Sequence, residues 1–296
     1  MIVVTAPTGQ IGSKLVPALL ERGEPVRLVA RDPGKLPAGV RERAEVVAGS
    51  HRDRAVLDRA LDGADALFWL MPAAATASSP YEAYVTASIP GADAVVRHGV
   101  PRVVVVSALG RGSQIYAGHI SASHAMEDLF RSTGAHVRAL ALPTFMDNIL
   151  RQAATIRAGV VSGTLPAGFT MPWIATKDIA ALAAGLLLDR SWTGQEPVEV
   201  LGGDDLSYSD IARILTEVAG VPIRYERGDR AAVRRFLVDR GFSEAMARSV
   251  VDMDVAAERG INHGTARTAG NTTPTTFREF AEETLEPALA EAGPRS

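Results

Sequence analysis

The sequence predicts an α/β fold, with a doubly wound parallel sheet (Rossmann) and a smaller, mostly helical C-terminal lobe. Short apolar runs alternate with amphipathic segments through the first half of the chain, which is the order that parallel strands joined by helices require. The run Val103–Val106 has no polar alternation, as is typical of a strand covered on both faces. We expect the Rossmann domain to span residues 1–145. Residues 146–296 should form a substrate-binding lobe, interleaved with that core, that closes over its crevice.

Apolar runs and helical periodicity place the individual elements. In the first half, strands are expected at 2–5, 26–30, 45–48, 66–70, 102–106 and 137–142, with helices at 13–22, 54–61, 81–98 and 123–133. In the second half, helices are expected at 145–157, 178–188, 209–219, 230–240, 243–258 and 277–291, with short strands at 197–201 and 223–226. The last helix follows the capping box Thr276-x-x-Glu279.

Composition excludes several classes of function. The 296 residues carry a net charge of −3 with interspersed signs, so nothing favours nucleic acid or an anionic membrane as a partner. The chain has no cysteine, which excludes disulfides and thiolate metal sites. The longest apolar run, Ile179–Leu188, is too short to cross a bilayer, and the first residues do not resemble a secretory leader. We expect a cytoplasmic protein that acts on a small molecule, and the oligomeric state stays open.

The turn that follows the first strand is the most informative segment. A strand, a glycine turn and a helix form the geometry in which backbone N–H groups hold a pyrophosphate, and the residues expected to do so are Thr8, Gly9, Gln10, Ile11 and Gly12. Ala6 stands where the fingerprint has its first glycine, and Pro7 removes an N–H group. The alternative interpretation is an ordinary strand–helix turn.

The end of the second expected strand indicates which dinucleotide would bind. Arg31 stands where an acid would contact the ribose 2′-hydroxyl of NAD, and an arginine suits the 2′-phosphate of NADP. The adjacent Asp32 weakens this distinction. Ligands of such sheets lie beyond the carboxyl ends of the strands. We therefore expect the strand-end residues to share the cofactor crevice, namely Met71, Pro72, Ser107, Pro143 and Phe145.

The Tyr-x-x-x-Lys pair that is common on this scaffold is excluded. The only lysines are Lys14, Lys35 and Lys177, and none lies between residues 36 and 176, where that pair would have to be. Any redox chemistry must therefore proceed without this acid.

Five motifs in order resemble the NmrA-like family of atypical short-chain dehydrogenases/reductases. They are the glycine turn with Ala30-Arg31-Asp32-Pro33, Ser107-Ala108-Leu109-Gly110, His124-x-x-Glu127-x-x-Phe130-x-x-Thr133-Gly134, Leu142-Pro143-Thr144-Phe145-Met146-x-Asn148, and Pro172 to Ala180. The resemblance covers nearly the whole chain. It implies an NADP-type cofactor, and either a reductase of quinones and other carbonyl, enone or azo compounds or a non-catalytic sensor of nicotinamide redox state.

The chain departs from the family pattern at three places. Ala6 replaces a glycine, Ser50-His51 stands where the family often has an acid near the adenine, and Leu142 replaces the arginine of a Leu-Arg-Pro segment. These departures concern the affinity for the cofactor rather than the fold.

Candidate side chains for chemistry are few. His124, on the helix after the fifth strand, is the candidate catalytic residue because a neutral imidazole could bind the nicotinamide ribose or relay a proton; it could equally be a cap or surface residue. His119 is a weaker candidate, and the spacing of the two histidines does not suit a metal, so no metal is expected. Phe145, Met146 and Trp173 are the expected substrate contacts, since an aromatic wall suits a flat conjugated molecule, although core packing explains them as well.

Three functions follow from these observations. The first is an NADPH-dependent oxidoreductase acting on a conjugated carbonyl or quinone-type small molecule. The second is a non-catalytic NADP(H)-sensing regulator, and the third is a cofactor-vestigial isomerase or cyclase that uses His124 or Asp147. The missing Tyr–Lys acid and the altered turn at Ala6 favour the second and third.

Overall fold

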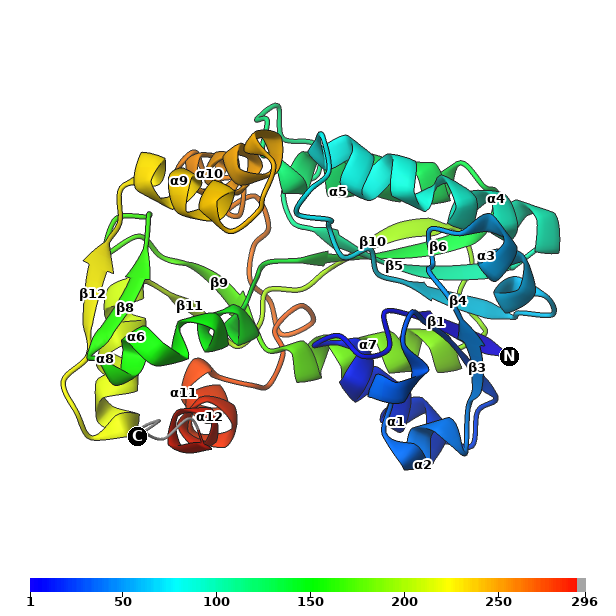
Figure 1. The fold of residues 1–296 in the computed structure, drawn as a ribbon, viewed down its shortest axis with the longest axis horizontal. Coiled ribbons are helices and arrows are strands. Elements are labelled where there is room, and N and C mark those ends of the chain that lie inside the picture. Colours follow the sequence, from blue (N-terminus) through cyan, green and yellow to red (C-terminus); the bar gives the residue numbers. More distant parts are fainter. Residues whose placement is uncertain (292–296) are drawn as a thin grey trace.

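Strand β1 (Ile2–Thr5) lies inside a seven-stranded sheet in the order β10-β6-β5-β4-β1-β2-β3 (Figure 1). The other strands are β2 (Val26–Ala30), β3 (Glu45–Ala48), β4 (Ala66–Trp69), β5 (Arg102–Ala108), β6 (His136–Leu142) and β10 (Gln195–Glu199). Every neighbouring pair is parallel. The chain builds outward from β1 to β3 on one side and from β4 to β10 on the other. The crevice of such a sheet is therefore expected at the carboxyl ends of β1 and β4.

Helices cover both faces of this sheet. Helices α1 (Gly12–Glu21) and α7 (Thr176–Leu188) pack on one face, and α3 (Arg54–Leu61), α4 (Ala87–His98) and α5 (His119–Arg131) on the other (Figure 1). Val4 belongs to the first core and Val3 to the second, and both side chains are fully buried. Successive residues of a strand point to opposite faces, so the central strands are apolar on both sides. The computed structural model, which describes residues 1–291, thus confirms the predicted fold class.

In the first half, the predicted and observed elements agree closely. Strands β1, β2 and β3 and helix α3 have the predicted bounds, whereas α5 begins four residues earlier than expected. A π-helical stretch at Glu82–Thr86 precedes α4. The sequence did not reveal the 3₁₀ turn Pro33–Lys35 or the short helix α2 (Ala38–Arg41), which connect β2 to β3.

The C-terminal lobe contains two small sheets that the sequence did not indicate fully. One pairs β7 (Thr144–Phe145), β9 (Met171–Ile174) and β11 (Asp204–Leu206), and the other pairs β8 (Val160–Gly163) with β12 (Arg224–Arg227). The helices of the lobe are α6 (Ala153–Arg157), α8 (Tyr208–Ala219), α9 (Arg230–Asp239), α10 (Glu244–Glu258), α11 (Phe277–Phe280) and α12 (Glu286–Glu291). The helix expected at 145–157 is a 3₁₀ segment, Met146–Gln152, followed by α6.

The two halves of the chain are interleaved. Helix α7 and strand β10 come from the range expected to form the lobe, but they complete one helical layer and one edge of the Rossmann sheet. The division at residues 145 and 146 stays a prediction, and residues 292–296 of that range lie outside the described residues.

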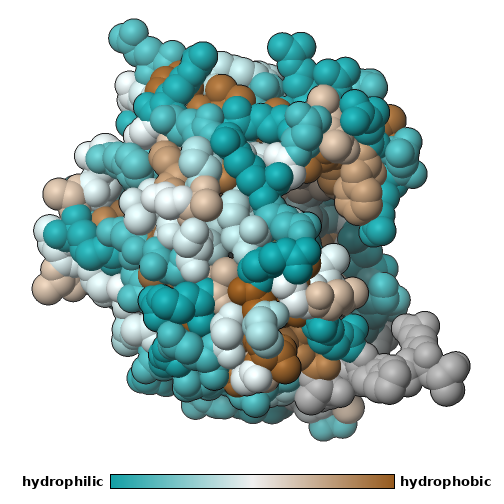
Figure 2. All heavy atoms as spheres, turned by 90° about the vertical axis from the view of Figure 1, so that its left-hand side faces the viewer, coloured by the Kyte–Doolittle hydropathy of each residue, from teal (hydrophilic) through white to brown (hydrophobic). Residues whose placement is uncertain are grey.

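The outer face of the lobe is mainly hydrophilic, with hydrophobic residues in separate patches (Figure 2). None of the helices within residues 1–291 combines the length and the hydropathy needed to cross a membrane.

Candidate cofactor-binding site

The turn after β1 has the backbone geometry of a glycine turn even though its first position is an alanine. Ala6 has a φ of +50°, a left-handed conformation that non-glycine residues adopt at a cost. The Gly9 N–H donates to the carbonyl of Ala6 over 3.1 Å. A Cβ atom on Gly12 would overlap the Ala6 carbonyl oxygen and lie 2.8 Å from the Pro7 Cα atom. Gly12 therefore permits the close approach of α1 to the end of β1.

The N-terminus of α1 points to this turn without a side-chain cap. Ile11 occupies the N-cap position and makes no side-chain hydrogen bond to the helix. The Ser13 N–H already donates to the Gly9 carbonyl over 2.9 Å, whereas the N–H groups of Gln10, Ile11 and Gly12 have no backbone acceptor within residues 1–291. Free N–H groups at a helix N-terminus attract anions. The geometry is thus suited to a phosphate group held by the backbone.

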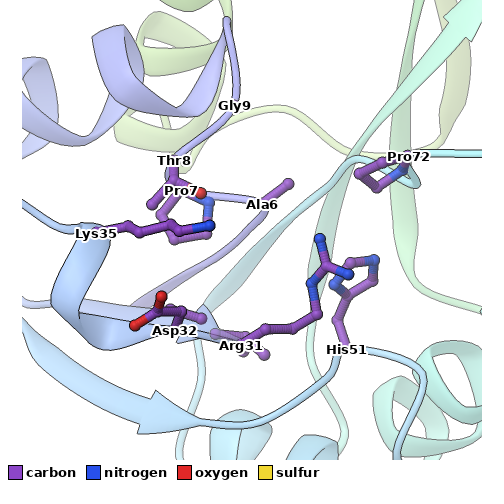
Figure 3. A pocket seen from close by; sticks show the side chains of 11 residues that line it. Ala6, Pro7, Thr8, Gly9, Arg31, Asp32, Lys35, His51 and Pro72 are labelled. Carbon is purple, nitrogen blue, oxygen red and sulfur yellow. The ribbon is translucent and has the colours of Figure 1, made fainter.

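A cavity of about 370 Å³ opens beside this turn, at the carboxyl ends of β1 and β2 (Figure 3). Among the residues predicted to bind a cofactor, it brings together Thr8, Gly9, Arg31 and Pro72. The complete lining is Ala6, Pro7, Thr8, Gly9, Val29, Ala30, Arg31, Asp32, Lys35, His51 and Pro72. Residues that lie up to 66 positions apart in the sequence therefore meet at one end of the sheet.

Two cations give this cavity its charge. Arg31 and Lys35 both line it and are exposed, and neither forms an ion pair with another residue in the described part of the chain. The Asp32 carboxylate accepts a hydrogen bond from the Gly34 N–H over 3.0 Å and so caps the 3₁₀ turn that carries Lys35. The acid next to Arg31 therefore has a local structural role, and the two cations remain available to an anion.

Lys35 and His51 line the cavity, although the sequence did not identify them as binding residues. Lys35 follows Arg31 by four residues, and the turn between them brings both side chains to the cavity. His51 follows β3, and its departure from the family pattern was the only signal in the sequence. Both positions depend on loops whose path the sequence did not predict.

Several predicted cofactor residues lie outside this cavity. The Gln10 amide donates to the carbonyl of Asp147 over 3.3 Å, and Gly12 acts through backbone packing as described above. Ile11 and Met71 are buried in the cores on opposite faces of the sheet, Pro143 is buried, and Phe145 is half-buried against the core beneath α7. Their predicted contact with a cofactor stays a prediction.

The end of β5 is occupied by a closed polar network. The Ser107 hydroxyl donates to Glu127 over 2.8 Å, and the buried Glu127 carboxylate also accepts from Arg131 over 2.8 Å and pairs with Arg111 over 3.0 Å. His124 is half-buried, and its Nε2 atom lies 2.9 Å from the Ala108 carbonyl oxygen. One ring nitrogen of the candidate catalytic histidine thus contacts the backbone.

The other histidine of this helix, His119, has an aromatic neighbour. Its ring lies edge-on to Tyr84, with 5.8 Å between the centroids. Burial lowers the pKa of His119.

Two expected substrate contacts belong instead to the interior of the lobe. Met146 and Trp173 are 0% and 1% exposed. The Trp173 indole donates to the Leu206 carbonyl over 3.1 Å and packs edge-on against Tyr208 and Phe277. Full burial leaves these two side chains no surface toward a substrate in this structure, and their role as substrate contacts stays a prediction. Phe145 is the one of the three that is partly exposed.

Asp147 also has a structural role. Its carboxylate accepts from the backbone N–H and the hydroxyl of Thr176 over 2.9 and 2.6 Å, and from the Lys14 ammonium group over 3.2 Å. It therefore caps α7 and ties α1 to the lobe. Lys177, the third lysine, pairs with Glu283. The lysines thus lie on α1, in the cavity and at the start of α7.

Within residues 1–291, no cluster of three or more histidine, aspartate or glutamate side chains is arranged to hold a metal ion.

Fold and cavity together define an α/β protein of the Rossmann type, with its cleft at the carboxyl ends of the central strands. Residues 1–281 match the model of the NmrA-like family, and the chain belongs to that family. It is 28% identical to the (4-alkanoyl-5-oxo-2,5-dihydrofuran-3-yl)methyl phosphate reductase of Streptomyces griseus, over 98% of this chain and 99% of the relative. It is 27% identical to the NAD(P)H azoreductase of Xenophilus azovorans, over 95% of this chain and 96% of the relative. The structure of Citrobacter sp. triphenylmethane reductase complexed with NADP(H) has the same fold, with a TM-score of 0.78 and 18% identity over 99% of this chain and all of that one.

Proposed function

We propose that this chain is an NADPH-dependent reductase of a conjugated carbonyl or quinone-type small molecule. The observation that carries the proposal is the cavity beside the Ala6–Gly9 turn, where Arg31 and Lys35 have no carboxylate partner among residues 1–291. Guanidinium and ammonium groups bind phosphate by charge-assisted hydrogen bonds. The names of two sequence relatives, a reductase of an unsaturated lactone phosphate and an azoreductase, support reduction of a conjugated acceptor.

The residues present fit a dinucleotide phosphate. The uncapped N-terminus of α1 would hold the pyrophosphate, and Gly12 allows α1 to approach the strand closely enough to do so. Arg31 and Lys35 would hold the 2′-phosphate. A bound reduced nicotinamide supplies the hydride. The chain supplies orientation, and the lobe would exclude water from the cleft and select the acceptor.

In the proposed reaction, proton donation by the protein contributes less than the positioning of the cofactor and the acceptor. The lysines lie away from α5, so no Tyr–Lys acid is formed, and Ser107 and His124 are engaged by Glu127 and the Ala108 carbonyl. A quinone-type acceptor needs little proton donation at the hydride step, which agrees with this arrangement. His124 would at most assist.

Oxidation of NADPH by an acceptor distinguishes a reductase from a non-catalytic sensor and from an isomerase or cyclase. NADPH absorbance is followed with the purified protein and a panel of quinones, enones and azo dyes, with protein-free mixtures as controls. A reductase oxidises NADPH with at least one class of acceptor. Tight NADPH binding without oxidation across the panel would contradict the proposal and favour a sensor. Absence of any NADPH binding would contradict both and favour an isomerase or cyclase.

A further inference from the structure

Helix α10 lies between the lobe and the segments that follow β4 and β5 in the Rossmann half (Figure 1). One side of the helix packs on these segments: Met246 is buried against Ala77 and Ala83, and Ala256 is buried against Ala117. We call this contact the seam. The opposite side of α10 belongs to the lobe, because Ala257 is part of the lobe core.

The lobe side of α10 is held by charged groups. Glu258 pairs with Arg227 of β12 over 3.1 Å and with Arg230 over 2.8 Å. The Asp254 carboxylate accepts a hydrogen bond from the Thr164 hydroxyl, next to β8, over 2.5 Å. Within residues 1–291, by contrast, no ion pair joins α9 or α10 to the Rossmann sheet or its helices. If the two halves separate, α10 should therefore move with the lobe.

The seam itself consists of small and uncharged groups. The Ser243 N–H donates to the Ala75 carbonyl over 2.9 Å, and the Ser243 hydroxyl donates to the Ala77 carbonyl over 2.5 Å. A Cβ atom on Gly118 would overlap the backbone of Ser249, so the start of α5 lies directly against α10. Domains that close by shear use small sliding movements between packed helices, and few polar contacts oppose such a movement here.

The closed seam leaves one polar atom without a partner. The Nδ1 atom of His119 is shielded from solvent and forms no hydrogen bond within residues 1–291, and the backbone of Met246 lies beside this side chain. A buried polar atom in this state destabilises the arrangement that buries it. Opening of the seam would let water satisfy the imidazole, which lowers the cost of opening.

The position of the seam connects it to the cleft. The cavity beside Arg31 does not extend to the ends of β5 and β6, since neither Ser107 nor Phe145 lines it. Ligands of a parallel sheet lie beyond the carboxyl ends of its strands, and α10 packs on the segments that leave β4 and β5 at that edge. Separation at the seam would open a route for an acceptor to this part of the edge.

We propose that α10 is a gate, which moves with the lobe away from the segments after β4 and β5 to admit the acceptor. Closure then excludes water while hydride is transferred. The hydrogen bonds of Ser243 break on opening, and the ion pairs of Glu258 stay intact. The role of the gate rests on the proposed function, because it requires an acceptor at the end of β5, whereas the opening itself can be measured without any ligand.

The first test measures the opening by thiol labelling, for which a chain without cysteine gives no background. Ser249→Cys places a thiol in the seam, and Ser88→Cys is the matched control in the Rossmann core; the two serines are 1% and 0% exposed. Labelling is followed by mass spectrometry, each rate is divided by that of the same variant unfolded in urea, and circular dichroism checks the fold. We expect Ser249→Cys to react at least about a hundredfold faster than the control, because the seam opens without global unfolding.

The second test locks the gate. Ala75→Cys combined with Ser243→Cys joins two residues whose backbone groups are hydrogen-bonded, which brings them within reach of a disulfide. Oxidation of this double variant should lower its rate of NADPH oxidation with an acceptor at least about tenfold. Reduction followed by desalting should restore the rate. Ser243→Cys alone, treated in the same way, is the control and should keep its rate.

The possible failures can be told apart. Equal labelling of Ser249→Cys and Ser88→Cys would show that the seam does not open, and would overturn the inference even for an active reductase. A double variant that is as active when oxidised as when reduced would show that the acceptor enters elsewhere. If the wild type oxidises NADPH with no acceptor, the proposed function fails and the role of the gate fails with it, but the labelling rates still decide whether the seam opens.

Discussion

Two places along the carboxyl edge of the sheet differ in whether their polar side chains have partners within the protein: the ends of β1 and β2, which we call the open end, and the end of β5, which we call the closed end. At the carboxyl ends of β1 and β2, Arg31 and Lys35 line an open cavity, and neither has a carboxylate partner in the part of the chain that the structure describes. At the end of β5, Ser107 and the buried Glu127 satisfy one another together with Arg111 and Arg131. The polar side chains at the ends of β1 and β2 are therefore available to a ligand, whereas those at the end of β5 stabilise the fold.

This contrast explains how a reductase could work without a dedicated acid. Binding free energy would be gained at the β1–β2 end, far along the dinucleotide from the reacting carbon. Interactions with the non-reacting part of a ligand can be used to orient its reacting part. The network around Glu127 would then keep the end of β5 rigid rather than transfer protons.

The largest expected effect is a loss of NADPH affinity caused by a substitution at the open end, in the turn after β1. Gly9→Val places two methyl groups in the cavity, beside a Cβ position that is already 3.3 Å from the Ala6 carbonyl oxygen. We expect NADPH affinity to fall by about a thousandfold or more, which is ~4 kcal/mol, measured by fluorescence titration. Gly39→Val, at a position with open space around it, is the matched control and should bind normally. A folded Gly9→Val protein that retains NADPH would show that the turn holds no dinucleotide.

A substitution at the closed end, in the network around Glu127, should lower the free energy of unfolding rather than the affinity for NADPH. Glu127→Gln keeps the shape of the side chain but leaves Arg111 and Arg131 without their shared buried carboxylate. We expect the free energy of unfolding, measured in urea, to fall by about 3 kcal/mol. NADPH affinity of the folded variant should change less than about threefold. A variant of normal stability with strongly weakened NADPH binding would reverse the assignment of the two ends.

The buried His51 makes the open end sensitive to acid. Burial lowers its pKa from the usual 6.5 to about 4 in the folded protein, so the unfolded chain binds more protons between these values. Stability must therefore rise with pH across this window and be lost as the pH falls from 6.5 towards 4. Between pH 7 and pH 5, the wild type should lose ~2 kcal/mol more unfolding free energy than His51→Phe does. Equal losses in the two proteins would mean that His51 is charged in the folded state.

The smallest effect concerns the strained residue of the turn. Ala6 has a φ of +50°, and glycine adopts this conformation without the steric cost that alanine bears. Ala6→Gly should therefore raise the free energy of unfolding by about 1 kcal/mol and leave NADPH binding intact. Ala18→Gly, inside α1, should have the opposite sign because glycine lowers helix stability. A destabilised Ala6→Gly protein would show that the alanine side chain contributes more than its backbone strain costs.

The Rossmann half could be predicted from the sequence because its signals are local. The bounds of β1, β2 and β3 follow from short runs rich in valine and other apolar residues between turn residues, and the glycine turn together with Arg31 identified the cavity at the ends of β1 and β2. The lobe strands were harder. Strand β9 has only four residues and contains Pro172, and β11 has three. Such short strands are specified by their pairing with each other, which no local pattern shows.

The site shows the same division between local and long-range information. Thr8, Gly9 and Arg31 were found because each lies next to a predicted strand end. His51 reaches the cavity only through the loop that follows β3, and Asp147 caps a helix 29 positions further along the chain. Aromatic composition alone did not separate core residues such as Trp173 from substrate contacts. Burial, which depends on the tertiary fold, makes that distinction.

The most direct test of the account is the preference for NADPH over NADH in the wild type and in Arg31→Ala, measured as dissociation constants by fluorescence titration. The wild type should bind NADPH at least about tenfold more tightly, a difference of ~1.4 kcal/mol, because the Arg31 guanidinium pairs with the 2′-phosphate. Arg31→Ala should remove that difference while NADH affinity stays nearly unchanged. A wild type that prefers NADH, or an Arg31→Ala variant that keeps the preference for NADPH, would contradict the assignment of the open end of the sheet to an NADP-type cofactor.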